Sequence, residues 1–268
     1  MKILSDNIIS SATLSSLHEN PLYPLLNLQD RYIRNAFESS SPSDTITLEW
    51  TVDQITNCIF WGYTNLSSML VKFLDSEDNI VELVYFSDGN VGHYYGYPDD
   101  NYYGYNADDY YGYYDRLSEH VYDPVSWFFS SDITFRKIEI TLTNSDSENI
   151  YLGGLAFGVA DTFPDPKEDF SPGLSDKSIA SIADAGQTQS MYYEPMRTYS
   201  LNFNLTHAEM LIMRAWYISL GKGVILWVDI SEKNHDFFSP VYSSLMSLSD
   251  FKKSGDRYTS TLKTQEAR

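Results

Sequence analysis

Apolar and polar residues alternate along much of this chain with a period of two, which is the side-chain period of a β-strand. The strand-like runs in the first part of the chain are residues 45–50, 55–63, 68–74, 80–86, 135–142 and 150–157. The run 55–63 is almost continuously apolar, as in a central strand, whereas 45–50 and 135–142 alternate, as in strands with one wet face. Six or seven short strands joined by polar turns such as 75–79 predict an antiparallel β-sandwich.

One segment near the C-terminus has helical spacing instead. Thr206 and Glu209 have the Ser/Thr-x-x-Glu spacing of a capping box, an apolar surface follows, and Gly221 is a stop signal. The neighbouring strand-like runs are 199–205, 224–230, 241–248 and 258–264. This order predicts a small C-terminal β-sheet domain with one packed α-helix, so the fold class is mainly β.

Charge divides the chain into two parts. The first 158 residues hold 7 Lys/Arg and 23 Asp/Glu, and the remaining 110 hold 11 and 14. The turn-rich stretch 160–167 marks the change, and no strong periodicity follows it. We therefore predict a sandwich domain at 1–158, a linker or arm at 159–190, and a C-terminal β/α domain at 191–268.

Overall composition excludes several classes of partner. The 268 residues carry a net charge of −19, which disfavours nucleic acid and anionic membranes, because both need a basic surface. No apolar run approaches the length of a membrane span, and the N-terminus lacks the pattern of a signal peptide. Cys58 is the single cysteine, so an internal disulfide and multi-cysteine metal sites are excluded, and its apolar neighbours predict that it is buried.

A tyrosine-rich octad repeats three times within residues 94–117. Each repeat begins Tyr-Tyr-Gly-Tyr, and the first two contain acidic pairs, Asp99-Asp100 and Asp108-Asp109. The candidate binding residues are the ten tyrosines of this segment: Tyr94, Tyr95, Tyr97, Tyr102, Tyr103, Tyr105, Tyr110, Tyr111, Tyr113 and Tyr114. Glycines and acidic pairs disfavour a continuous strand or helix, so the repeat predicts a long loop.

Several roles are open to this loop. Tyrosine offers a flat apolar ring and a hydroxyl at low conformational cost, so the segment can pack on its own domain or a neighbouring subunit, or stack on sugar rings. Single-stranded nucleic acid also stacks on tyrosine, but residues 94–115 hold five Asp and no Lys or Arg. The acidic pairs could gather Ca²⁺, although no twelve-residue calcium loop is present, and solvated turn acids are the simpler interpretation.

Catalytic signatures are missing from the sequence. The five histidines show no metal-binding spacing, and the chain has no nucleophile elbow, phosphate-binding loop or dinucleotide fingerprint. A glycosidase-like carboxylate pair remains open because acids are abundant. We therefore predict no catalytic residues, no metal site, no cofactor and no enzymatic activity.

The order of segments resembles tailed-phage virion proteins that begin with a discoidin-like (galactose-binding-like) jelly roll. The resemblance is carried by 7–9, 12–14 and 21–30 at the start, 135–140 after an aromatic-rich insertion, and 150–158 at the end of the first domain. In the second domain it is carried by the strand 197–205, the helix, the buried strand 224–229 and the final residues 265–267. The Tyr-Gly octad departs from the Trp/Pro-rich insertion typical of that group.

This resemblance implies a structural component of a phage tail tip, baseplate or decoration. Its implied partners are other phage tail proteins, through a homo-oligomeric ring or attachment to a tail ring, without insertion into a membrane. Its implied location is the virion tail, after assembly in the host cytoplasm. The alternative is a carbohydrate-binding module that recognises a host cell-surface glycan through the octad loop.

Overall fold

The computed structural model divides the chain into two compact units. The sandwich unit is Asp6–Ala160, and the α/β unit combines Met1–Ser5 with Asp161–Ile230 and Val241–Arg268. The residues described are 1–29, 35–86, 125–167, 171–175, 179–182, 188–191, 196–220, 224–229 and 241–267.

Seven antiparallel strands build the sandwich unit. They are β2 (Thr13–Ser16), β3 (Phe37–Glu38), β4 (Ser43–Thr64), β5 (Ser68–Leu74), β6 (Ile80–Phe86), β7 (Val125–Thr143) and β8 (Tyr151–Gly158), with the 3-10 helices Ile8–Ser11 and Leu25–Gln29. The strand order is β3-β8-β4-β7-β5-β6, and β2 pairs with β4. The predicted antiparallel sandwich is therefore confirmed.

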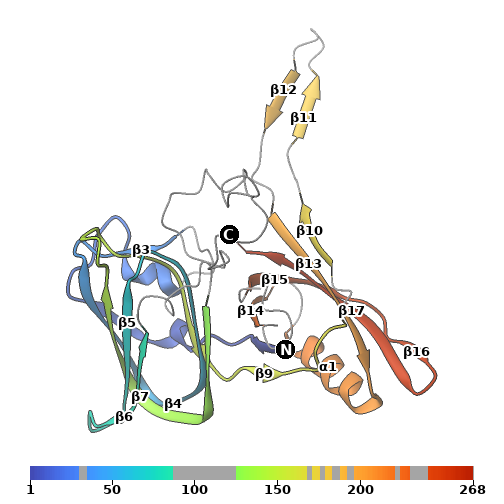
Figure 1. The fold of residues 1–268 in the computed structure, drawn as a ribbon, viewed down its shortest axis with the longest axis horizontal. Helices are drawn as coiled ribbons and strands as arrows, with labels where there is room; N and C mark the ends of the chain where they lie inside the picture. Colours follow the sequence, from blue (N-terminus) through green and yellow to red (C-terminus); the bar gives the residue numbers. More distant parts are fainter. Residues whose placement is uncertain are drawn as a thin grey trace, which may run out of the picture. The chain divides into compact units, whose positions relative to one another are not determined.

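The two longest strands, β4 and β7, pass from one layer of the sandwich into the other. Residues 43–49 of β4 pair with 137–143 of β7, whereas 54–61 pair with 125–135, and the register shifts between Glu49 and Gln54. One layer is thus β2, β4, β7, β5 and β6, and the other is β3, β8, β4 and β7. Figure 1 shows both strands bending. The sequence predicted separate strands at 45–50 and 55–63; a bulge bends the chain between them, so no turn is needed.

Side chains from both layers fill one apolar core. Its fully buried members include Ile46 and Leu48 of β4, Phe73 of β5, Ile138 of β7 and Phe157 of β8. Cys58 is also buried, as predicted, and its Sγ donates to the Gly158 carbonyl at 3.3 Å.

The α/β unit is a second antiparallel sheet with one helix. Its elements are β1 (Lys2–Leu4), β9 (Asp161–Thr162), β10 (Ser171–Ser175), β11 (Ile179–Ile182), β12 (Thr188–Met191), β13 (Met196–Leu205), α1 (His207–Leu220), β14 (Ile225–Asp229), β15 (Val241–Leu248), β16 (Lys252–Ser254) and β17 (Arg257–Glu266). The sheet order is β10-β13-β17-β15-β14-β1-β9, β16 pairs with β17, and β11 and β12 form a separate hairpin. Helix α1 lies against β13 and β17.

Two predicted boundaries differ from this arrangement. Residues 1–5 were assigned to the sandwich, but β1 pairs with β14 and β9 in the α/β unit, with Ile3 opposite Val228 and Asp161. The predicted linker 159–190 contains four short strands, and β10 extends the sheet beside β13. Both features depend on partners that are distant in the sequence, so local periodicity did not reveal them.

The capping box predicted at the start of α1 is present. The Thr206 backbone N–H donates to Glu209 Oε2 at 2.7 Å, and the Glu209 N–H donates to Thr206 Oγ1 at 3.3 Å. Met210, Met213 and Trp216 form the buried face of the helix. No helix among the described residues is long and apolar enough to cross a bilayer.

Removing the cap should produce a pH-dependent loss of stability. The Thr206 backbone N–H, and then its hydroxyl, lower the pKa of Glu209 from its ordinary 4.5. Its stabilisation is therefore present above about pH 4.5 and is lost as the pH falls through the folded-state pKa. We expect Glu209→Ala to lower the free energy of unfolding by about 0.5–1 kcal/mol at pH 7, and by less at pH 3. Denaturant unfolding at both pH values measures this, and an equal loss at both would contradict the carboxylate's role.

Candidate functional site

The ten predicted binding tyrosines, Tyr94 to Tyr114, lie outside the described residues, as do both Asp-Asp pairs. The structure does describe the strands that flank this part of the chain. Strand β6 ends at Phe86 and β7 begins at Val125, so residues 87–124 are connected to the sandwich at these two points.

The two flanking strands meet through aromatic contacts at one end of the sandwich. The rings of Phe86 and Trp127 have centroids 5.6 Å apart in an edge-to-face arrangement. The ring of Phe86 also contacts the ring of Trp61, and these two centroids are 4.5 Å apart. Phe86 and Trp61 are buried, so they fix the end of β6 against the start of β7. The chain therefore leaves the sandwich before the octad and returns after it at the same place.

Two aromatic side chains beside this place reach the surface. Trp127 is 45% exposed and pairs with Ile59 of β4, and Tyr85 is 61% exposed and pairs with Leu70 of β5. They belong to different layers of the sandwich, one on each flanking strand. The flanks thus carry the same chemistry as the octad, namely flat rings with one polar group each. We call Tyr85 and Trp127 the flanking aromatics.

Sequence reasoning missed the flanking aromatics. The apolar pattern predicts a strand that begins at Phe135. In the structure this strand, β7, begins at Val125 and includes the consecutive aromatics Trp127, Phe128 and Phe129. The Phe128 ring contacts Phe60 and the Phe129 ring contacts Phe73, each at 5.6 Å between centroids. Three adjacent aromatic residues are a strand signal, but they do not alternate with polar ones.

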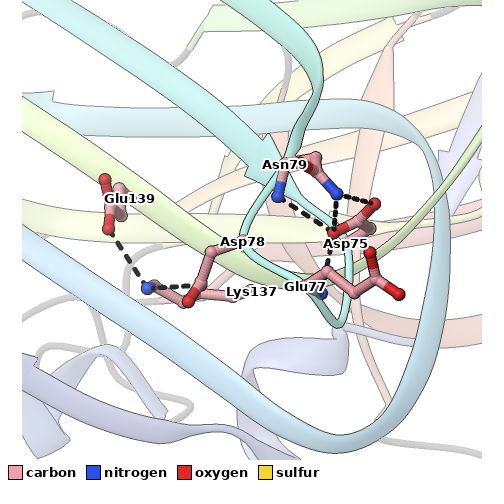
Figure 2. A network of polar contacts seen from close by, with 6 residues as sticks. All are labelled: Asp75, Glu77, Asp78, Asn79, Lys137 and Glu139. Carbon is pink, nitrogen blue, oxygen red and sulfur yellow. Dashed lines mark hydrogen bonds and ion pairs between the residues drawn. The ribbon is translucent and has the colours of Figure 1, made fainter.

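The acidic turn between β5 and β6 holds a network of polar side chains (Figure 2). Asp75 Oδ1 accepts hydrogen bonds from the backbone N–H groups of Glu77 (2.8 Å) and Asn79 (2.9 Å), and Asp75 Oδ2 accepts from Asn79 Nδ2 (3.1 Å). Hydrogen bonds from the side chain of Asn79, and then from the two backbone groups, lower the pKa of Asp75. Both oxygens of this carboxylate therefore accept hydrogen bonds within the predicted turn, and these bonds close the turn.

Lys137 forms ion pairs with two other acids of that cluster. Its Nζ lies 2.9 Å from Asp78 Oδ1 and 3.3 Å from Glu139 Oε1. The hydrogen bond to Asp78 is the main cause of its raised pKa, followed by the one to Glu139. In the part of the chain that the structure describes, no group of three or more His, Cys, Asp or Glu side chains is placed to hold a metal ion. The turn therefore fixes the start of β6.

Comparisons with known proteins give a likeness of fold. No protein family and no curated protein matches the chain. Among solved structures, the chain is similar to the lectin domain of lectinolysin complexed with Lewis B antigen (9% identity, TM-score 0.41, covering 59% of this chain and 99% of that one). It is also similar to chitosan-binding module 1 from a Paenibacillus chitosanase/glucanase (10%, 0.40, 58% and 100%). A third is the family 32 module of C. perfringens NanJ in complex with galactose (11%, 0.38, 56% and 94%).

Identities and TM-scores this low say nothing of what this chain binds. The fold class rests on the strand order and pairing described above, which give a mainly β protein with an antiparallel sandwich. The resemblance to phage virion proteins stays a prediction, as do the ring, the tail partners and the location.

Proposed function

We propose that this chain is a non-catalytic binding protein whose sandwich unit presents the tyrosine octad, residues 94–117, to a neutral glycan. The observation that supports this most directly is the contact between Phe86 and Trp127, with centroids 5.6 Å apart. It brings the end of β6 and the start of β7, the two points at which residues 87–124 join the sandwich, together beside the flanking aromatics. Binding loops supported by a rigid β scaffold are a common arrangement for recognition.

Charge selects the class of glycan. Residues 1–158 have an excess of 16 acidic groups, and five Asp but no Lys or Arg lie within residues 94–115. An anionic polymer would be repelled by this part of the protein. A neutral sugar meets no such penalty, and its apolar ring faces can pack on tyrosine and tryptophan rings.

Deleting the octad tests this function. We expect the full chain to bind neutral oligosaccharides on a glycan array, and a variant with residues 94–117 replaced by a short Gly/Ser linker to lose at least about 10-fold in affinity, a difference of about 1.4 kcal/mol. Trp127→Ala should weaken binding as well. Leu22→Ala, at an exposed apolar position in the turn hydrogen-bonded to β3, should not.

A second candidate function is the structural role in a phage tail. It is favoured by the outer face of α1, where Leu211, Ile212 and Ile218 are exposed and Ile218 reaches 68%. The helix therefore has apolar side chains on both its buried face and its outer face. An exposed apolar helix face is typical of a surface that contacts another protein. In this reading the α/β unit docks onto other tail proteins, and the chain is found in the virion tail.

The same deletion separates the two functions in a phage that encodes this chain. Loss of glycan binding with normal particles favours recognition. Failed particle assembly with unchanged adsorption to cells favours the structural role, and mass spectrometry of purified virions should then detect the chain. A chain that is missing from virions and binds no glycan would contradict both proposals.

A further inference from the structure

Strand β6 forms an edge of its layer. It pairs with β5 on one side, and no described strand pairs with its other side. Exposed edges of this kind are usually blunted with lysine, proline or a bulge, because they can pair with another chain. Residues 80–86 contain neither lysine nor proline, and the one register shift lies at the start of the strand, opposite Phe73 and Leu74. The stretch from Glu82 to Phe86 is therefore regular, and no strand of the described residues pairs with its outer side.

The outward side chains of this edge strand are apolar. Val81, Leu83 and Tyr85 are exposed, and Leu83 is 47% exposed. Val84 packs against the core and Phe86 is part of it. Strand β6 therefore has one face towards the core and one apolar face towards solvent. Side chains on a wet face are normally polar, so a partner for this face is expected.

The backbone of Leu83 points to the open side of the strand. Its N–H donates to Glu82 Oε1 at 3.0 Å, so it is not part of the ladder with β5. Backbone groups alternate in direction along an antiparallel strand, so the N–H and C=O of Tyr85 point to the same open side. A neighbouring strand can take the place of the half-buried Glu82 carboxylate at the Leu83 N–H.

We propose that a second copy of this chain occupies this edge, with two β6 strands paired antiparallel about a two-fold axis at Leu83. This register places Leu83 opposite Leu83 of the second copy, Val81 opposite Tyr85, and Glu82 opposite Val84. Every apolar outward side chain then meets an apolar one, and no two carboxylates face each other.

Charge favours this register over the one whose axis lies at Glu82. Glu82 is the only charged residue between Ile80 and Phe86 in a chain with a net charge of −19. An axis at Glu82 would put two carboxylates directly opposite each other, which is destabilising. The same argument makes β6 a suitable contact for two strongly acidic molecules, because it is a nearly uncharged surface. A five-residue strand pair buries less than the roughly 1,200–2,000 Å² of stable interfaces, so the dimer is weak and depends on concentration.

Disulfide cross-linking of the full chain tests the register. In a hydrogen-bonded antiparallel pair the opposite Cα atoms lie about 5.5 Å apart, within the range that a disulfide spans. We expect Leu83→Cys to form a covalent dimer under mild oxidation, several-fold above the wild type, whose Cys58 is buried. The matched control is Val81→Cys, because two copies of residue 81 would lie about 13 Å apart. The double variant Val81→Cys/Tyr85→Cys should cross-link, because those residues are opposite.

Three results would overturn this proposal. The first is no cross-linking by Leu83→Cys above the wild type at about millimolar protein, with an unchanged circular dichroism spectrum. The second is equal cross-linking by Val81→Cys, which would indicate random collision. The third is cross-linking of Leu83→Cys only after residues 87–124 are deleted, which would show that the chain's own segment covers the edge. Sedimentation should support the proposal by showing weaker association for Leu83→Lys than for the wild type.

Discussion

Replacing Phe73 with alanine is expected to lower the free energy of unfolding of the sandwich unit by about 3–5 kcal/mol, the usual cost of removing a large buried aromatic side chain. Phe73 is fully buried in β5. Its ring contacts Phe135 at 5.1 Å, Phe129 at 5.6 Å and Phe157 at 6.0 Å between centroids. Phe157 lies on β8 of the opposite layer, so this one ring joins both layers of the core.

Hydrogen exchange during denaturant unfolding is a suitable measurement, because peptides from β5 and β8 report on the sandwich unit separately from the α/β unit. Val52→Ala is the matched control, since Val52 is an exposed apolar residue of β4, and we expect it to change stability by less than about 0.5 kcal/mol. A loss below about 1 kcal/mol for Phe73→Ala would show that this cluster does not hold the layers together.

Asp44→Ala is expected to cost about 1.5–3 kcal/mol, the range for hydrogen bonds to charged groups. Asp44 is a buried acid of β4 that holds the β2 end of the sheet. Its Oδ2 accepts from Ser16 Oγ at 2.6 Å, and its Oδ1 accepts from the backbone N–H groups of Thr45 at 2.7 Å and Leu17 at 3.2 Å. Alanine leaves these donors without their acceptor.

Asp44→Asn separates the hydrogen bonds from the charge. Asparagine keeps the shape and one acceptor oxygen, so its loss of stability in the same exchange experiment should be smaller than that of alanine. Equal losses would assign the effect to the negative charge alone. Unchanged stability of Asp44→Ala would show that the contacts of Asp44 are not needed for the attachment of β2.

Local periodicity predicted the elements whose ends are marked by local signals. The bounds of β5, β6 and β15 agree with the apolar runs 68–74, 80–86 and 241–248, because polar residues or proline flank each run in the sequence. Helix α1 was predicted equally well, because its capping box is a contact over three residues. The first half of β7 was missed, because Trp127, Phe128 and Phe129 follow one another without alternation.

The candidate site was predictable only in part. The octad is visible as a repeat, so its tyrosines could be named as candidates from the sequence. The contact between the rings of Phe86 and Trp127 could not be predicted from the sequence. It depends on how β4, β5 and β7 pair, and those partners are far apart in the sequence. The placement of β1 beside β14 has the same cause.

The pairing of β1 with β14 also sets the order in which the chain can fold while it is being synthesised. Among the described residues, all strand partners within the sandwich unit lie between Thr13 and Gly158, so these strands can pair before the later part of the chain has left the ribosome. Strand β1 precedes the sandwich in the sequence, but its partners β9 and β14 both follow the sandwich, so β1 can pair with β9 only after residue 162 and with Val228 of β14 later still. Residues 2–4 therefore complete their strand pairing only after the whole sandwich has been synthesised.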